Sequence, residues 1–274
     1  METGKRPLLA LLLVGFLGLI TFLTVLGFLV PWRPGVATDE GRGIDSVISY
    51  LLFVTGLILV AGHVVLVRFL WQSTGPTPAA YRRPSARTEW LWGIIPALVM
   101  LLISEVGVLA VASPVWDSLY LEEPADPILV EVTGKQFEWI VRYPGEDGLY
   151  GRTSFAAVDV AEQNDLGIDE KDPAGQDDVV KRGTLYLPRG RPVVVRLRTQ
   201  DVIHSFFVPE FRVKQDLIPG FDTRLKFTPN RNGEFELACA ELCGLGHYTM
   251  RGKVIVLEPA EFEAWLGKQY RFGG

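Results

Sequence analysis

One stretch near the C-terminal end of the chain combines the side chains best suited to metal chemistry. It reads Cys239-Ala-Glu-Leu-Cys243-Gly-Leu-Gly-His247-Tyr-Thr-Met250, and His204 precedes it. Thiolate, imidazole and thioether groups are the ligands that soft copper ions prefer, whereas structural zinc sites rarely use methionine and hard cations need oxygen ligands. The residue types therefore predict a copper site.

The soft ligands exceed the needs of one copper ion. A blue-copper ion uses one Cys, two His and a weak axial Met, but this stretch and His204 supply two Cys, two His and one Met. The chain has only three His, two Cys and three Met in all. Their gathering here favours a metal site over a disulfide or a set of core side chains. A second copper ion, with both thiolates bridging the pair, accounts for the surplus.

Such ligands need a rigid frame, and the sequence after residue 127 supplies short β-rich runs with Pro and Gly between them. That pattern is typical of a β-sandwich or barrel. A short amphipathic helix is expected at the end, beginning at Pro259 with Phe262 and Trp265 on one side. The expected strands are Ile128–Thr133, Phe137–Tyr143, Thr184–Leu187, Val193–Thr199, His204–Val208, Thr223–Thr228, Glu234–Ala238 and Lys253–Leu257.

An acidic insertion, residues 144–183, interrupts the strand pattern. It carries ten carboxylates against four basic residues. The pattern predicts a long loop, which is either a solvated insertion or a surface that steers a basic redox partner. No Cys-x-x-Cys-His motif occurs in the chain, so no haem is expected on it.

The first part of the chain is different in composition. Overall, 48% of the 274 residues are hydrophobic, the formal net charge is -5 and the mean hydropathy is +0.21. No charged residue occurs in Pro7–Trp32 or Ser46–Val67, and Glu105 is the only one in Trp90–Trp116. A bilayer core needs about 20 apolar residues, so each stretch is long enough to span a membrane. The chain is therefore expected to contact membrane lipid.

Basic residues predict which side of the membrane each loop faces. Lys5 and Arg6 precede the first apolar stretch, and Arg68, Arg82, Arg83 and Arg87 lie between the second and third. Positive loops stay in the cytoplasm, so the loop Arg33–Asp45 and everything from Ser113 onward are expected outside. The first stretch resembles a signal peptide in its order of charge and apolar run. It is longer than the usual 7–15 residues and lacks a clear A-x-A-like site, which favours an uncleaved helix without settling the matter.

Three segments follow from these observations. Residues 1–32 are expected to form a transmembrane helix or uncleaved signal-anchor, and residues 46–112 a two-helix transmembrane hairpin. Residues 113–274 are expected to form an extracytoplasmic domain that contains the copper ligands and the acidic insertion.

Several parts of the chain resemble those of a known family. They are the copper motif Cys-x-Glu-x-Cys-Gly-x-x-His-x-x-Met, the stretches Val202–Pro209 and Lys214–Gly220, and the spans from Ser46 to Ala112. The chain is similar to subunit II of haem-copper terminal oxidases, the family of cytochrome c oxidase subunit II. The resemblance implies a membrane-anchored, all-β cupredoxin-like Greek-key sandwich with a short C-terminal helix. It also implies a binuclear copper A centre in that domain.

Roles for individual residues follow from the resemblance. Cys239 and Cys243 would bridge both coppers, with His204 and Met250 completing one ion. His247 and the backbone carbonyl of Glu241 would complete the other.

Two carboxylates gain further roles from the same family. The Glu241 side chain would help bind a magnesium ion shared with subunit I. Glu89, just before the third apolar stretch, would stand at the mouth of a proton pathway into subunit I. Where the family has Gln-Trp-x-Trp, this chain has Gln136-Phe137-Glu138-Trp139, so Phe137 and Trp139 are both candidates for receiving the incoming electron.

The family further implies a respiratory function. The subunit would accept electrons from cytochrome c or a similar basic donor and pass them to haem in subunit I. Oxygen would be reduced to water there, coupled to proton translocation. Subunits I and III, but no nucleic acid, are the expected partners. The expected location is a bacterial plasma membrane, with the copper domain on the periplasmic side.

Other classes of protein share some of these features. A quinol-oxidase subunit II would lack the metal ligands, and a copper carrier would need neither Glu89 nor Glu241. The two-copper domain of nitrous oxide reductase is normally fused to a large enzyme for which this chain has no room. A nitric oxide reductase subunit stays open.

Overall fold

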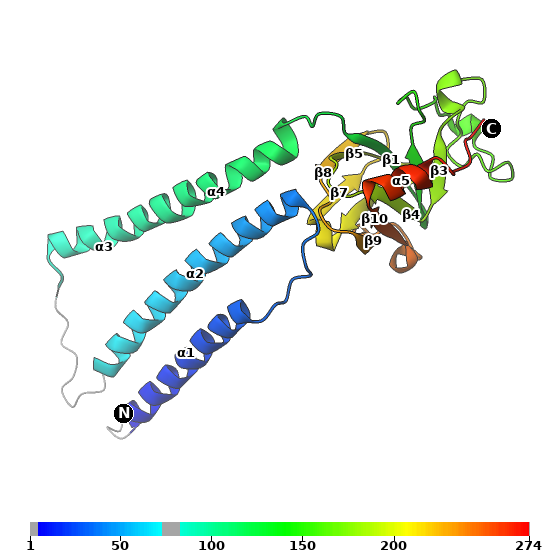
Figure 1. Cartoon of the computed structure of the whole chain (residues 1–274). Coiled ribbons are helices and arrows are strands. Elements are labelled where there is room, and N and C mark those ends of the chain that lie inside the picture. The colour runs from blue at the N-terminus through cyan, green and yellow to red at the C-terminus, as the bar shows by residue number, and fades with distance from the viewer. Residues whose placement is uncertain (1–4, 73–82, 274) are drawn as a thin grey trace. The chain divides into compact units, whose positions relative to one another are not determined.

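The computed structural model describes residues 5–72 and 83–273 (Figure 1). Arg82, one of the basic residues used to orient the chain, lies outside this range. The chain divides into two compact units. A helical unit comprises the described parts of Met1–Pro34 and Asp45–Pro114, and a β unit comprises those of Gly35–Ile44 and Val115–Gly274.

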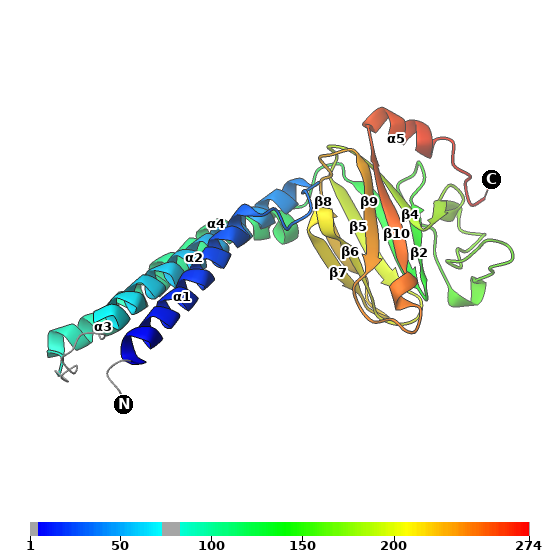
Figure 2. The same ribbon diagram turned by 90° about the horizontal axis from the view of Figure 1, so that it is seen from below.

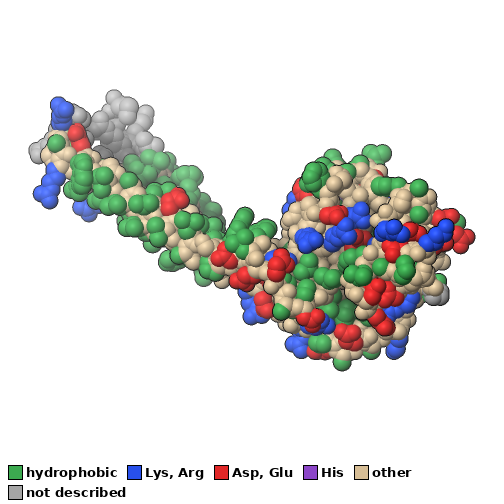
Figure 3. Space-filling view, turned by 90° about the horizontal axis from the view of Figure 1, so that it is seen from above, with side chains coloured by type: hydrophobic (Ala, Val, Ile, Leu, Met, Phe, Trp, Pro, Cys, Tyr) green, Lys and Arg blue, Asp and Glu red, His purple; other side chains and the backbone are tan. Residues whose placement is uncertain are grey.

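Apolar helices account for the helical unit. They are α1 (Lys5–Leu29), α2 (Asp39–Gln72) and a continuous third helix, Ala86–Leu121, in which α3 (Ala86–Val99) and α4 (Gly107–Trp116) are separated by a π-helical segment. All three are long and apolar enough to cross a membrane. Hydrophobic side chains cover the helices in Figure 3. A helix that is apolar all round needs a membrane or a partner to cover it.

Contacts within the helical unit join its helices. The Phe28 ring of α1 lies against Gly56 of α2, where a Cβ atom would come within 2.9 Å of Phe28 Cε2. Between α2 and the third helix, the Tyr50 hydroxyl donates a hydrogen bond of 2.5 Å to the carbonyl of Ile103. A small residue and a side-chain hydrogen bond are both typical of helix contacts inside membranes.

Two five-stranded sheets form the β unit, in the orders β3-β2-β1-β5-β8 and β4-β10-β9-β6-β7 (Figure 2). The pairs β1/β5 and β4/β10 are parallel, and the other strand pairs are antiparallel. The strands are β1 (Ile128–Lys135), β2 (Glu138–Tyr143), β3 (Val179–Arg182), β4 (Thr184–Pro188), β5 (Val193–Thr199), β6 (His204–Val208), β7 (Val213–Leu217), β8 (Thr223–Phe227), β9 (Gly233–Cys239) and β10 (Arg251–Leu257).

Alternation along the strands builds the core of this sandwich. In β5, Val193, Val195 and Leu197 are buried while the residues between them are only partly so. Since successive side chains of a strand point to opposite faces, one face of each sheet can be apolar. The helix α5 (Pro259–Leu266) begins with the expected proline and buries Phe262 in the core. The predicted membrane-anchored, cupredoxin-like sandwich with a C-terminal helix is confirmed.

Two strands were missed by the sequence analysis, β3 and β7. The expected loop over residues 144–183 is therefore wrong at its end, because Val179–Arg182 pairs with β2. The insertion proper joins β2 to β3 and covers residues 144–178. A buried ion group holds its ends: Arg142 and Glu131 are each 1% exposed, Asp178 is fully buried, and Arg142 contacts both carboxylates.

Residues 35–44, where a loop was expected between the first two spans, belong to the β unit and include the first residues of α2. We call this segment the N-terminal strap. Ala37 and Thr38 are fully buried. The Ala37 N–H donates to the carbonyl of Glu210 at 2.8 Å, and the Thr38 hydroxyl donates to that of Phe211 at 2.9 Å. The strap is thus part of the sandwich core, although more than a hundred residues separate it from its partners.

Candidate metal centre

Neighbouring strands bring the predicted copper ligands together. His204 begins β6 and Cys239 ends β9, and the register pairs Phe206 with Cys239. The loop from Cys239 to β10 then folds back, because the Cys239 N–H donates to the carbonyl of Met250 at 3.2 Å. Both ends of the ligand loop are therefore fixed by the sheet.

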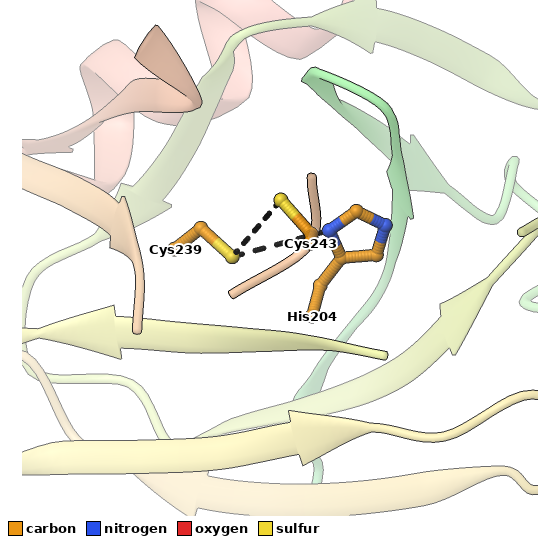
Figure 4. A group of neighbouring side chains, drawn as sticks. All are labelled: His204, Cys239 and Cys243. Atoms are coloured by element: carbon orange, nitrogen blue, oxygen red, sulfur yellow. Dashed lines mark hydrogen bonds between the residues drawn. The ribbon is translucent and has the colours of Figure 1, made fainter. Parts of the chain in front are cut away.

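The ligand atoms lie within 4 Å of their neighbours. Figure 4 shows three of these side chains, His204, Cys239 and Cys243, pointing toward one another. Cys239 Sγ is 3.9 Å from Cys243 Sγ and 3.9 Å from His204 Nδ1. Cys243 Sγ is 3.7 Å from His247 Nδ1 and 3.8 Å from Met250 Sδ. Both cysteines are free, so the disulfide alternative is not realised in this structure.

This spacing fits metal ions held between the side chains. A thiolate–metal bond is about 2.3 Å long, so two such bonds reach across about 4.6 Å at most. Cys239 Sγ and Cys243 Sγ, 3.9 Å apart, are close enough for one ion to bind both. The nearest ligand atoms of His204, Cys239 and Cys243 all lie within 4.8 Å of one another. Sulfur and imidazole donors favour soft copper over hard cations.

The centre is buried beneath a loop whose tip is exposed. His204 is fully buried, and Cys243 and Met250 are 3% and 1% exposed, whereas the loop residues Leu242 and Leu245 are 82% and 98% exposed. Burial, with a smaller effect from Cys239, raises the pKa of the Cys243 thiol to about 11. A metal that binds this thiol as thiolate must therefore displace its proton.

Asp201 orients one imidazole, a role that the sequence analysis missed. Its Oδ1 lies 2.7 Å from His204 Nε2. Burial opposes ionisation of Asp201, but hydrogen bonds from the N–H of Gln136, from His204 and from the N–H of Val202 together lower its pKa. An ionised carboxylate only accepts, so Nε2 carries the proton and Nδ1 is free to bind a metal. The signal in the sequence was an acidic residue three positions before a ligand histidine.

Glu241 contributes two groups with different surroundings. Its backbone carbonyl lies 3.2 Å from Cys239 Sγ, at the centre. Its side chain is 44% exposed and pairs with Lys214 Nζ at 3.1 Å. The carbonyl thus lies beside a ligand sulfur, while the predicted magnesium ligand is an exposed carboxylate paired with an ammonium.

The two aromatic candidates for receiving the electron lie in unlike positions. Phe137 is 36% exposed, and its ring lies against Gly246 of the ligand loop, where a Cβ atom would come within 2.4 Å of Phe137 Cδ2. Trp139 is fully buried, and its ring centroid is 6.3 Å from that of His204. Glu89 belongs to the other unit, where it is exposed in the first turn of α3.

Comparison with known proteins agrees with this arrangement. Residues 128–258 match the family model for the periplasmic domain of cytochrome c oxidase subunit II. The "Alternative cytochrome c oxidase subunit 2" of Bradyrhizobium diazoefficiens is 39% identical over 249 residues, which cover 89% of this chain and 85% of that protein. Cytochrome c oxidase subunit 2 of Cereibacter sphaeroides is 31% identical over 83% of this chain and 73% of its own length.

Among solved structures, the periplasmic domain of subunit II of cytochrome oxidase (CoxB) from Bradyrhizobium japonicum is similar at 29% identity. The match covers 54% of this chain and 95% of that domain, with a TM-score of 0.39. The full-length relatives align with both the apolar helices and the β-sandwich. The chain therefore belongs to the cytochrome c oxidase subunit II family, as a membrane-anchored subunit of a haem-copper oxidase with an extracytoplasmic β domain.

Proposed function

We propose that this chain is the electron-accepting subunit of a respiratory cytochrome c oxidase. It takes electrons from cytochrome c or a similar basic carrier at a two-copper centre and delivers them to haem in subunit I. Oxygen is reduced to water there, with proton translocation. One observation carries the proposal: two thiols, two imidazoles and one thioether surround one another at 3.7–3.9 Å.

The same geometry supports a ligand assignment. Cys239 and Cys243 would hold both ions, and His204 with Met250 would complete one of them. His247 and the carbonyl of Glu241 would complete the other. When bound, the copper pair supplies a one-electron acceptor beneath the protein surface.

Residues around the ligands hold them in fixed positions. Gln136 Nε2 donates to the carbonyl of Cys243 at 2.5 Å, and the Ala240 N–H donates to that of Ser205 at 3.1 Å. Asp201 fixes the ring of His204 in the same way. Ligands held by such outer contacts move little when the charge of the centre changes, which favours rapid electron transfer.

The electron enters through Phe137 in this proposal. Its ring is partly exposed and also touches the ligand loop at Gly246, so it joins the surface to the centre. Trp139 cannot meet a donor directly because it is fully buried. Its edge-on contact with His204 instead helps to support the ligand from inside the core.

The remaining assignments concern the partner subunits and the membrane. Glu241 would bind magnesium together with subunit I. Its carboxylate would then release the Lys214 ammonium and bind the magnesium ion instead. Glu89, exposed at the start of α3, would lead protons toward subunit I. Subunit III is a further expected partner. The chain would span a bacterial plasma membrane with all its apolar helices and place the β unit in the periplasm, unless residues 1–32 are removed as a signal peptide.

Electron paramagnetic resonance of the copper-loaded full chain in detergent tests the central proposal. We expect two copper ions per chain and a spectrum in which both nuclei share one unpaired electron. His204→Ala should destroy that spectrum, while His63→Ala, which removes an imidazole in α2, should leave it unchanged. A single localised copper, or copper that a chelator removes readily, would contradict the proposal and favour a copper carrier.

A further inference from the structure

A basic pocket lies at the edge of the β unit where β7 and β8, the edge strands of the two sheets, adjoin. The lining includes four cationic side chains and no carboxylate. Apolar residues complete the wall, from the strap and from the last turn of the third helix. The lining residues are Ile44, Leu119, Tyr120, Arg212, Val213, Lys214, Gln215, Arg224, Leu225 and Lys226.

Two of the lining residues, Ile44 and Tyr120, are close in the chain to the apolar stretches. Tyr120 comes four residues after Trp116, the end of the third apolar stretch, which is about 6 Å at 1.5 Å per residue. Ile44 comes two residues before Ser46, the start of the second stretch. The headgroup layers add about 10–15 Å to a hydrocarbon core of about 30 Å. One layer is half of this, about 5–7 Å, so Ile44 and Tyr120 each follow an apolar stretch by no more than about the depth of one headgroup layer.

Aromatic side chains at the same level support this placement. The rings of Trp116 and Tyr120 have centroids 4.4 Å apart, and the residues are 60% and 56% exposed. Exposed Trp and Tyr are enriched where a helix leaves the hydrocarbon region, since their rings combine an apolar body with a polar atom.

The cations of the pocket differ in how far they are neutralised. Lys214 pairs with Asp216 and Glu241, and Lys226 Nζ lies 3.9 Å from a Glu123 oxygen. Arg224 is exposed, and within residues 5–72 and 83–273 no carboxylate forms an ion pair with it. The pocket thus presents positive charge that the described part of the chain does not balance.

We propose that this pocket binds the headgroup of an anionic phospholipid from the leaflet next to the β unit. Arg224, with Arg212 and Lys226, supplies donors for the phosphate, because guanidinium groups match phosphate oxygens in geometry and charge. Ile44, Leu119 and Leu225 supply apolar lining for the part of the lipid next to its headgroup. This site lies beyond the proposed electron transfer and needs no copper, so either proposal can fail alone.

Lipid titration of the full-length chain tests the site. The chain is purified in a mild detergent, stripped of lipid and titrated with dioctanoyl phosphatidylglycerol or dioctanoyl phosphatidylcholine, with bound lipid counted by native mass spectrometry. We expect phosphatidylglycerol to bind at least about fivefold more tightly. Arg224→Gln should weaken its binding about fivefold, the effect of one basic residue at a membrane surface. Arg224→Lys should retain most of the affinity.

Controls separate this site from general attraction and from the copper centre. Lys253→Gln removes one exposed positive charge on β10, outside the pocket, and should not change lipid binding. Copper content should be the same in every variant. Equal binding of the two lipids, or equal losses in Arg224→Gln and Lys253→Gln, would overturn the proposal. Inorganic phosphate that displaces the lipid at equal concentration would reduce the pocket to a free-anion site and overturn the lipid assignment.

Discussion

Asp201→Asn tests how the protein prepares His204 for metal. In the wild-type chain, Asp201 Oδ1 accepts from His204 Nε2 and the Val202 N–H, both at 2.7 Å. Its Oδ2 accepts from the Gln136 N–H at 2.7 Å. Asparagine has one acceptor oxygen and one donor NH2 group, so it cannot satisfy all three donors.

Either orientation of the new amide has a cost. With its oxygen toward His204, its NH2 group faces the Gln136 N–H and leaves a donor unsatisfied. With its NH2 group toward His204, Nε2 must accept, and the proton moves to Nδ1, the atom that should bind the metal. Loss of such an orienting partner typically lowers metal affinity 10–100-fold. That range corresponds to about 1.4–2.7 kcal/mol.

Competition with a chelator of known copper affinity measures this change on the full chain in detergent. Asp159→Asn is the matched control, because Asp159 also accepts from two backbone N–H groups but lies in the insertion. We expect the control to bind copper as the wild type does. Wild-type affinity in Asp201→Asn would refute the argument that Asp201 sets the tautomer of His204.

Three further changes probe the core and the ligands. Thr38→Val leaves the Phe211 carbonyl and the Gly41 N–H without their hydrogen-bond partner. The free energy of unfolding should fall by roughly 3 kcal/mol and the Tm of the β unit by roughly 6–12 °C. Thr184→Val, the control, should change stability little. Met250→Leu keeps the volume of a residue that is 1% exposed, so calorimetry should show a loss below about 1.5 kcal/mol while the copper absorption spectrum changes. Arg142→Met leaves the fully buried carboxylate of Asp178 without its cation, whereas Glu131 keeps Arg196 and Arg198, so we expect a loss of about 3–5 kcal/mol in unfolding experiments and faster proteolysis within residues 144–178.

Residue types were enough to find the cluster, but not its surroundings. Soft ligands are scarce in this chain, so their concentration between residues 204 and 250 was informative without any structure. Gln136 and Asp201 gave no comparable signal, because amides and carboxylates are common on protein surfaces. Their contacts with the ligand loop and with His204 depend on how the β1–β2 turn folds beside it. Composition thus predicts metal ligands better than the groups that orient them.

Position within a sheet decided which strands the sequence could predict. The interior strand β5 alternates buried and partly buried residues from Val193 to Arg198, and its predicted bounds agree with the structure. The edge strand β7 has buried residues only at its ends, Val213 and Leu217, with three polar residues between them. The other missed strand, β3, has four residues and also lies at an edge. An edge strand packs against fewer neighbours, so its apolar pattern is weaker.

The strap shows why the extracytoplasmic domain is not simply the C-terminal part of the chain. Besides burying Ala37, it satisfies polar groups of the sandwich, since Glu40 accepts from the Thr228 N–H at 2.7 Å and from the Thr228 hydroxyl at 3.1 Å. A fragment that begins at Ser113 lacks these partners and would expose part of its core. The strap also follows any cleavage point near residue 32, so removal of the first helix would leave it in place. The β unit therefore depends on the connection to α2 and not on the fate of α1.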